Sequence, residues 1–507
     1  MTPFAHATTP GGFLLVLAVI LPVCAVLAIF ACGPRSAARI AMTTLAAGLA
    51  IAIAIAVELI ASGAALSYVV GAWRPPLGIA LRADGLSGAM LVMTALVVVT
   101  VGLFARVQYG LHDGAGGGRA QTTFWLMLLA LWSALNAVFV GEDLFNLYVA
   151  LELLTFAAVP LVCLDGRAET VKAALRYLLF ALVGSLLYLL GTGLIYGQYG
   201  TLDLLTLSRL SRQEPALSAA LALMIVGLLA KAALFPLHLW LPPAHAGAPA
   251  PASAVLSALV VKAPVFLILR LVLDVAPPQA AAIAGQLLAV LGAASILFCS
   301  VMALRQARLK LMIAYSTVAQ IGYLFIVFPL AAGSAELPPW GTIAWTGGAL
   351  QLVSHALAKA AMFLAAGVIA EAFGHDRIAD LGGFGRALPL SAAAFGLAGL
   401  SLMGIPPSGG FVAKCLLLTA AVIEGYPWLA ATILAGGLLA GGYVFRVIDT
   451  ALAIPAVPVA PRRPVPRRLE LAALALAVAA VLLGLVPLRP FGLLQIGRDG
   501  LAMAGLP

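Results

Sequence analysis

Residues 404–414 read GIPPSGGFVAK and interrupt an apolar stretch, residues 388–422, that is long enough to cross a membrane. Proline removes a helical hydrogen-bond donor, and glycine weakens a helix. Non-helical backbone at membrane depth is tolerated only where protein buries it or where it lines a water-filled cavity. The stretch therefore predicts a broken membrane helix, with Lys414 beside the break. The residues predicted to form the break are Pro406, Pro407, Gly409 and Gly410.

The composition of the whole chain agrees with a membrane protein. Of its 507 residues, 63% are hydrophobic and only 9% are charged, and the mean hydropathy is +1.12. A soluble domain carries about 25% charged residues, so a soluble multidomain fold is a poor interpretation. The net charge of +9 is not gathered into a basic face, which argues against nucleic-acid binding.

Apolar segments of about 20 residues recur along the chain, which is the length that a membrane-spanning helix needs. The sequence predicts an all-α polytopic membrane protein with about fourteen transmembrane helices and short loops. The predicted spans are 12–32, 38–62, 86–106, 122–140, 144–164, 170–198, 217–240, 251–274, 280–303, 309–332, 342–371, 389–422, 428–453 and 469–489.

Positive charge is unevenly divided between the two sides of these spans. The loops after the odd-numbered spans, with the adjoining helix ends, hold sixteen lysines and arginines, and the opposite side holds six. Cytoplasmic loops are enriched in Lys and Arg. We therefore expect both termini on the non-cytoplasmic side of a multi-pass membrane protein.

Lysine is used in an unusual way in this chain. There are 22 arginines but only six lysines, and four of the six fall inside predicted spans: Lys231, Lys262, Lys359 and Lys414. A lysine near a helix end can reach the headgroups, but four near mid-span argue against that explanation. Unlike arginine, a buried lysine can release its proton, so these residues are candidates for a proton path.

Candidate partners for the lysines are also present. Glu152 lies in the middle of the span 144–164, deeper than other carboxylates. His355 precedes Lys359 by four residues, so both side chains lie on one face of a helix. Pro236 follows Lys231 by five residues and predicts a second broken helix. Two interrupted spans, one in each half of the chain, are typical of transport sites in proteins with repeated halves.

Five segments together resemble the antiporter-like proton-channel family. This family includes large membrane subunits of respiratory complex I, related subunits of membrane-bound hydrogenases, and the large subunits of Mrp-type cation/proton antiporters. The resemblance covers roughly residues 80–425 and rests on DLFNLYVALELLTF, AKAALFPLHLWLPPAHAGAPAPASAVLSALVVK, RLKLMIAYSTVAQIGY, SHALAKAAMFLAAGVI and GIPPSGGFVAK.

The resemblance implies roles for particular residues. Glu152 and Lys231 look like the family's paired glutamate and lysine, Lys262 like its central relay lysine, and Lys414 like its terminal lysine. His355 and Lys359 resemble the relay between them. His238 and His245 match family positions of second rank.

The resemblance also implies an architecture. It has two inverted five-helix repeats in which the seventh and twelfth helices are broken. The expected divisions are an N-terminal part (1–121), a first half-channel (122–274), a second half-channel (280–453) and a C-terminal helix (469–507).

Function follows from the same resemblance. We expect an ion-translocating, proton-conducting subunit of a multisubunit complex in a bacterial inner membrane, similar to the D-type subunit of an Mrp-type Na⁺/H⁺ antiporter. A subunit of NADH-quinone oxidoreductase (complex I) or of a membrane-bound hydrogenase is the alternative. Other membrane subunits, lipid, protons and Na⁺ are the expected partners, and no cofactor, metal or nucleic acid is expected.

Two further classes stay open at this point. A redox subunit that binds quinone itself would be recognised by a bound chromophore after purification. A solitary carrier of an organic solute would keep its uptake without partner subunits. Whether the chain takes part in an enzyme depends on its host complex, since the sequence contains no redox or hydrolytic motif.

Overall fold

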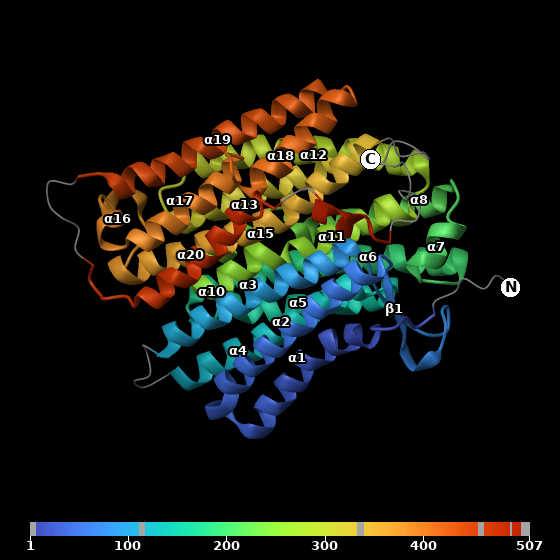
Figure 1. Ribbon diagram of the computed structural model, residues 1–507, viewed down its shortest axis with the longest axis horizontal. Helices are drawn as coiled ribbons and strands as arrows, with labels where there is room; N and C mark the ends of the chain where they lie inside the picture. The colour runs from blue at the N-terminus through green and yellow to red at the C-terminus, as the bar shows by residue number, and fades with distance from the viewer. Residues whose placement is uncertain (1–6, 111–116, 332–338, 455–460, 487–488, 498–507) are drawn as a thin grey trace.

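The structure is a computed structural model that describes residues 7–110, 117–331, 339–454, 461–486 and 489–497. Its helices pack side by side into one bundle, and most of them run between the same two ends of the molecule (Figure 1). The helices that cross the bundle without interruption are α1 (Phe13–Cys32), α2 (Ala37–Ser62), α3 (Gly85–Gly110), α4 (Gly117–Val140), α5 (Leu144–Val162), α6 (Ala168–Tyr199), α12 (Pro278–Leu304), α13 (Leu309–Phe325), α15 (Pro339–Phe373) and α19 (Pro427–Leu452).

Twelve helical segments among the described residues are long and apolar enough to span a membrane. Two shorter apolar helices, α17 (Pro389–Met403) and α18 (Gly409–Ile423), follow one another and together make one more crossing. The last apolar helix is α20 (Arg467–Leu482), which packs against α15 and α17. The chain is thus an all-α polytopic membrane protein with about fourteen spans, as the sequence predicts.

Both predicted helix breaks are present. The first separates α8 (Pro215–Ala232) from α9 (Leu241–Gly247), and the second separates α17 from α18. At the first break Ala233 adopts a left-handed conformation (φ 55°), which a non-glycine residue rarely does, and at the second Gly404 does so (φ 81°). A left-handed residue directs the chain out of the helix, so it ends each half-helix.

The span after the first break is helical but irregular. It consists of α10 (Ala250–Val255), a π-helical turn η3 (Leu256–Val260), α11 (Lys262–Arg270) and a second π-helical turn η4 (Leu271–Val275). A π-helical turn shifts the backbone hydrogen-bond pattern and is frequent at functional sites. The sequence predicts only one continuous span here.

Short elements complete the described chain. They are α7 (Leu204–Leu210), α14 (Val327–Ala331), α16 (Phe384–Ala387), and the 3₁₀ turns η1 (Pro34–Ser36), η2 (Val70–Ala72), η5 (Ile378–Asp380) and η6 (Arg489–Gln495). Strands β1 (Leu66–Val69) and β2 (Ala80–Ala83) form an antiparallel hairpin in which Leu66 is opposite Ala83. The sequence predicts only a loop at this hairpin.

The hairpin marks one end of the bundle, called the hairpin face below. The backbone of Thr9 donates to the Ser67 carbonyl, and Arg82 donates to the Gly497 carbonyl. Both ends of the described chain therefore lie at the hairpin face, as an even number of crossings requires. α7 lies at the same end (Figure 1), and so does the chain after η6, because the Gly85 backbone donates to the Ile496 carbonyl.

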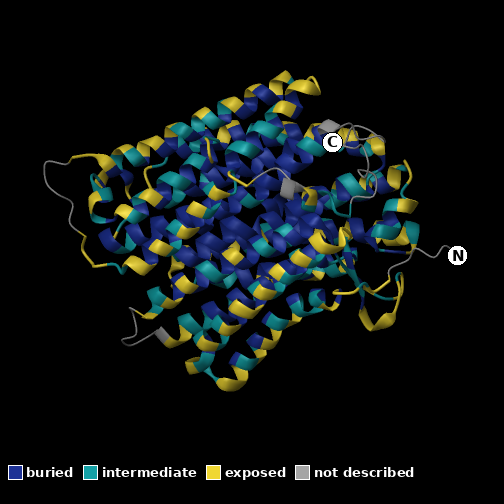
Figure 2. Ribbon diagram, viewed as in Figure 1, coloured by how far each residue is buried: buried dark blue, intermediate teal, exposed yellow. Residues whose placement is uncertain are grey.

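Burial separates the central helices from the peripheral ones. Figure 2 shows buried residues concentrated in the middle of the bundle and exposed residues along its margins. The most apolar window is 94% buried in Gly341–Phe373 and in Ala250–Val275, but only 28% buried in Phe13–Cys32. Large apolar side chains such as Phe30 and Leu438 are exposed, which suits helices that face lipid. The first-rank candidate relay residues lie on α5, α8, α11, α15 and α18.

Candidate proton-relay site

The first lysine forms an ion pair at the first helix break. Lys231 lies in the last turn of α8, and its Nζ is 2.9 Å from a carboxylate oxygen of Glu152 on α5. Nζ also donates to the Thr155 hydroxyl at 3.2 Å, and the hydroxyl of Ser185 donates to Glu152. Both charged side chains are largely buried, so each depends on the other and on these hydroxyls for the contacts that water would supply.

The second lysine, Lys262, is completely buried and lies immediately after the π-helical turn η3. Its Nζ donates to the backbone carbonyl of Ser257 at 2.9 Å. This carbonyl lies within the π-helical turn, where the regular α-helical hydrogen-bond pattern is interrupted. A carbonyl supplies an acceptor but no counter-charge, so this lysine lacks the anion that Lys231 has.

Ser257 links Lys262 to Lys359 through two separate groups, its backbone carbonyl, which accepts from Lys262, and its side-chain hydroxyl. The Ser257 hydroxyl is 2.8 Å from the hydroxyl of Thr317 on α13, and Thr317 donates to the Ile313 carbonyl at 2.9 Å. Lys359 Nζ, from α15, donates to the same carbonyl at 3.2 Å and also to the Ser316 hydroxyl. Two buried cations on different helices are therefore connected through neutral polar groups.

His355 lies within electrostatic reach of three lysines. Its ring interacts with Lys262, Lys359 and Lys414. It is 1% exposed, and neither ring nitrogen has a hydrogen-bond partner among the described residues. A neutral imidazole can accept a proton on one nitrogen and donate from the other, so His355 can exchange protons with groups that approach it.

Lys414 lies on α18, a turn after the second break. Its Nζ donates to the Leu402 carbonyl at 2.5 Å, close to the end of α17, and lies 4.2 Å from the ring centre of Tyr323. Gln320 donates to the same carbonyl at 3.1 Å and accepts from Gln351 of α15 at 3.1 Å. The Leu402 carbonyl at the break thus accepts from Lys414 and from Gln320, and Gln320 in turn contacts α15 through Gln351.

The two second-rank histidines lie close to the first break. His238 is in the non-helical segment between α8 and α9, where aromatic rings surround it, Phe235 among them. His245 is on α9, fully buried, and stacks on Phe363 with ring centres 4.6 Å apart. It interacts electrostatically with Lys359 and Lys310. The structure thus brings His245 close to the relay from the face opposite the hairpin.

The residues named for the breaks have two different positions. Pro236, Pro406 and Pro407 lie in the non-helical connections, as the sequence predicts. Gly409 and Gly410 instead belong to the first turn of α18. A Cβ on Gly410 would lie 1.9 Å from the Ser401 carbonyl oxygen. Gly410 therefore allows α18 to pack closely against α17, whereas a Cβ on Gly409 would meet Leu483, at the end of α20, at 3.0 Å. Since both glycines are helical, the prediction that they form part of the break is wrong.

Sequence reasoning missed the neutral polar residues that contact the candidate relay residues directly or through other hydrogen-bonded groups. They are Thr155, Ser185, Ser257, Ser316, Thr317, Gln320 and Gln351. One signal was available, since RLKLMIAYSTVAQIGY contains buried hydroxyl and amide groups in an otherwise apolar span. In a membrane interior such groups hydrogen-bond across helices, so they indicate helix contacts without identifying the partner.

Comparison with known proteins decides the family. The family described as NADH:quinone oxidoreductase/Mrp antiporter, TM, matches residues 141–440, more than half of the chain. The chain belongs to the NADH:quinone oxidoreductase/Mrp antiporter family. The matched range contains all six first-rank relay candidates, from Glu152 to Lys414.

Both branches of the NADH:quinone oxidoreductase/Mrp antiporter family are represented among similar proteins. NADH-quinone oxidoreductase subunit N of Desulforudis audaxviator is 37% identical over 464 residues, which are 88% of this chain and 89% of that protein. The D subunit of the Na(+)/H(+) antiporter of Bacillus subtilis is 28% identical, and the match covers 75% of this chain and 74% of that protein. A chain in the structure of the Mrp complex from Dietzia sp. DQ12-45-1b has a TM-score of 0.85 at 25% identity, with 96% of both chains covered.

Proposed function

We propose that this family member is the proton-translocating membrane subunit of a multisubunit complex. The observation that carries the proposal is the Glu152–Lys231 ion pair at the first helix break, followed by buried lysines and hydrogen-bonded side chains that continue to the second break. Isolated buried charges are expensive, so an arrangement of four lysines with one carboxylate needs a functional reason.

The proposed mechanism moves a proton across the plane of the membrane. While Glu152 and Lys231 are paired, the carboxylate holds Lys231 in its charged form. When the pair separates, the buried ammonium loses its counter-charge and the neutral amine is favoured. The proton then passes by way of Lys262 and Lys359, with His355 as the exchange point, to Lys414 at the second break.

The division into half-channels is part of this proposal. Residues 122–274 would form the first half-channel and 280–453 the second, with 1–121 and 469–507 flanking them. Since the two broken helices occupy the same place in each five-helix set, Lys231 and Lys414 would stand at equivalent positions of the two half-channels. We further propose that both termini, and thus the hairpin face, lie outside the cytoplasm of a bacterial cell.

Two host complexes fit the family. An Mrp-type Na⁺/H⁺ antiporter is our first choice, because the structural similarity to a chain of the Mrp complex extends over 96% of the protein. Complex I is the second candidate, and the 37% identity to a subunit N favours it. In either complex, other membrane subunits would supply the driving force, and only the antiporter would exchange Na⁺ for protons.

The test is to replace Glu152 by Gln in the assembled complex and to measure proton movement in inverted membrane vesicles. Gln keeps the shape but not the charge, so we expect proton movement to be nearly abolished while the complex still assembles. Glu470 offers a matched control, since it is also buried but accepts bonds from Ser391 on the far side of the bundle. Glu470→Gln should transport normally. Normal transport in assembled Glu152→Gln would refute the proposal.

A further inference from the structure

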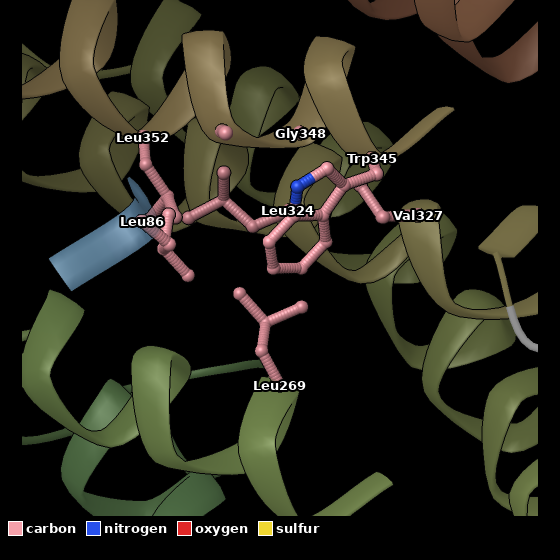
Figure 3. Close-up of a pocket in the computed structure, with 8 residues that line it drawn as sticks. Leu86, Leu269, Leu324, Val327, Trp345, Gly348 and Leu352 are labelled. Atoms are coloured by element: carbon pink, nitrogen blue, oxygen red, sulfur yellow. The ribbon is translucent and has the colours of Figure 1, made fainter. Parts of the chain in front are cut away.

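A small apolar cavity lies among the central helices, as the close-up in Figure 3 shows. Its volume is about 10 Å³, which leaves room for about one water molecule. Eight residues line it: Leu86 of α3, Leu269 of α11, Leu324 of α13, Val327 of α14, and Trp345, Gly348, Ala349 and Leu352 of α15. The Trp345 indole N–H donates to the Leu494 carbonyl of η6 at 2.9 Å. The cavity wall therefore offers water almost no hydrogen-bonding group.

The position of the cavity connects two polar regions. On one side, Leu352 follows Gln351 and precedes His355 by about one helical turn, so the cavity adjoins the relay. On the other side, Leu86 precedes Ser87 and Leu269 precedes Arg270. Arg270 belongs to a charged cluster near the hairpin face, and its guanidinium donates to the Ser87 hydroxyl.

The charged cluster is buried and contains both signs of charge. The Arg270 guanidinium is 2.6 Å from the Asp84 carboxylate and 3.1 Å from that of Asp274. Arg82, on β2, is 4.0 Å from Glu142, whose side chain is 9% exposed. None of these residues is part of the relay described above, and Glu142 is the most loosely paired carboxylate among them.

We propose that this cavity and the Glu142 carboxylate form the route by which protons leave the relay at the hairpin face. The inference rests on the proposed function and adds an outlet to it. In the resting structure the apolar wall keeps the cavity dry, since one water there would lack the partners that buried waters need. When more water enters, a proton can cross to the charged cluster. The proton leaves an N–H bond of a relay cation, which becomes neutral, and passes between the O–H groups of water. Glu142 binds it as a carboxylic acid and then releases it to water outside.

The surroundings of Glu142 suit such an exchange. Burial raises the pKa of the Glu142 carboxyl to about 7, because the guanidiniums of Arg82 and Arg270 offset only part of the desolvation and Asp203 and Asp84 act with it. Asp84 differs: burial raises its pKa too, but Arg270, the Ser87 backbone N–H and Arg82 together outweigh burial, and the pKa lies below the usual range. The groups that face Glu142 are thus Arg82 from β2, Arg270 from α11, Asp84 before α3, and Asp203 before α7.

Gly348 makes the cavity testable by filling it. A Cβ at this position would lie 2.5 Å from a methyl group of Val327, a second residue of the wall. Gly348→Ala should therefore close the cavity and slow proton movement about tenfold or more. Gly347→Ala is the matched control, because its Cβ would point at Leu416 of α18 at 3.0 Å, away from the cavity. Amounts of assembled complex are compared for both variants.

A second variant tests the opposite change and does not depend on tight packing. Leu269→Asn places a hydrogen-bonding group in the wall, so water should enter and vesicles should lose an imposed pH gradient faster than the parent. Leu267→Asn, a buried position on the same helix that does not line the cavity, controls for general disruption.

A third variant tests the carboxylate. Glu142→Gln should lower proton movement and remove the dependence of proton movement on hairpin-side pH near 7.

The outcomes separate this inference from the proposed function. If Lys262→Ala and Gly348→Ala both stop transport, Gly347→Ala does not, and Leu269→Asn leaks, the outlet is supported. If Lys262→Ala stops transport but assembled Gly348→Ala and Glu142→Gln behave like the parent, the outlet is refuted and the relay stands. If Lys262→Ala transports normally, the relay itself is wrong and the outlet falls with it.

Discussion

The lysine at the first broken helix has a carboxylate partner, whereas the lysine at the second has none among the described residues. Lys231 lies 2.9 Å from Glu152, while Lys414 has a backbone carbonyl and the face of Tyr323. A carbonyl dipole and an aromatic ring attract a cation less strongly than a full negative charge does. The lysines at two similar backbone breaks are thus stabilised in their charged form to unequal degrees.

In the proposed relay, this difference gives each end a distinct task. At the first break the charge on lysine depends on whether the pair is closed, so a movement of α5 relative to α8 would control proton release. At the second break no anion among the described residues holds the proton, so Lys414 is suited to exchange it with its surroundings. Because the two lysines have unequal partners, the two ends of the proposed path differ, whereas a path of identical sites would have no preferred direction.

The largest effect is expected at the first break. Lys231→Ala should abolish proton movement, and it leaves Glu152 buried without its partner. Breaking one member of a buried pair costs about 3–5 kcal/mol of stability, whereas removing both costs much less. We therefore expect the thermal stability of Glu152→Gln/Lys231→Met to return toward that of the parent, although transport stays absent.

Thermal unfolding and proton uptake in vesicles, measured on the same preparations, check this prediction. If the double variant were less stable than either single variant, the two residues would not act as a pair. If it transported, the pair would not be the control point.

The second break should tolerate a change of charge better than the first. Lys414→Arg keeps the positive charge but cannot release a proton at any accessible pH, so transport should be lost. Lys414→Glu keeps a titratable group and should retain part of the activity, because no anion described at this break depends on the lysine for its charge. Cation-driven proton movement, corrected for assembled complex, distinguishes the two. Proton movement at the parental rate in both variants would show that Lys414 is structural.

A smaller effect, on stability, is expected where α18 meets α17. Gly410→Ala places a methyl group against the Ser401 carbonyl, so the two half-helices must move apart, at a cost of about 1–3 kcal/mol. Gly396→Ala on α17 is the control, since its Cβ would have a first contact at 3.4 Å, with Ile448. There alanine should be neutral or slightly stabilising. A melting curve for each variant is sufficient, and equal melting temperatures would contradict the packing role of Gly410.

The features that the sequence predicts correctly are those with strong local causes. Long apolar runs predict the spans, proline and glycine predict both breaks, and the rarity of mid-span charge draws attention to Glu152 and the four lysines. The break near Lys231 begins three residues before Pro236, at Ala233. Proline predicts that a helix ends nearby, but tertiary packing decides the residue.

The features that the sequence does not predict depend on contacts between distant segments. Serine and threonine are common in all membrane helices, so nothing local shows that Ser257 meets Thr317, which is 60 residues away. The π-helical turn before Lys262 contains no proline or glycine from which it could be predicted. Arg270 lies near a helix end and resembles an interfacial residue, until the fold places Asp84 beside it.

The most direct test of the relay is Lys262→Arg in the assembled complex, with proton movement measured in inverted vesicles. Lys262 is fully buried at the centre of the path, and arginine preserves its charge while preventing proton release. Lys172→Arg, at an exposed lysine on α6, serves as the control. The relay predicts that Lys262→Arg assembles but moves almost no protons, while Lys172→Arg behaves like the parent. Proton movement at the parental rate in Lys262→Arg would contradict it, because a path that works with a permanently charged residue at its centre does not pass through that residue.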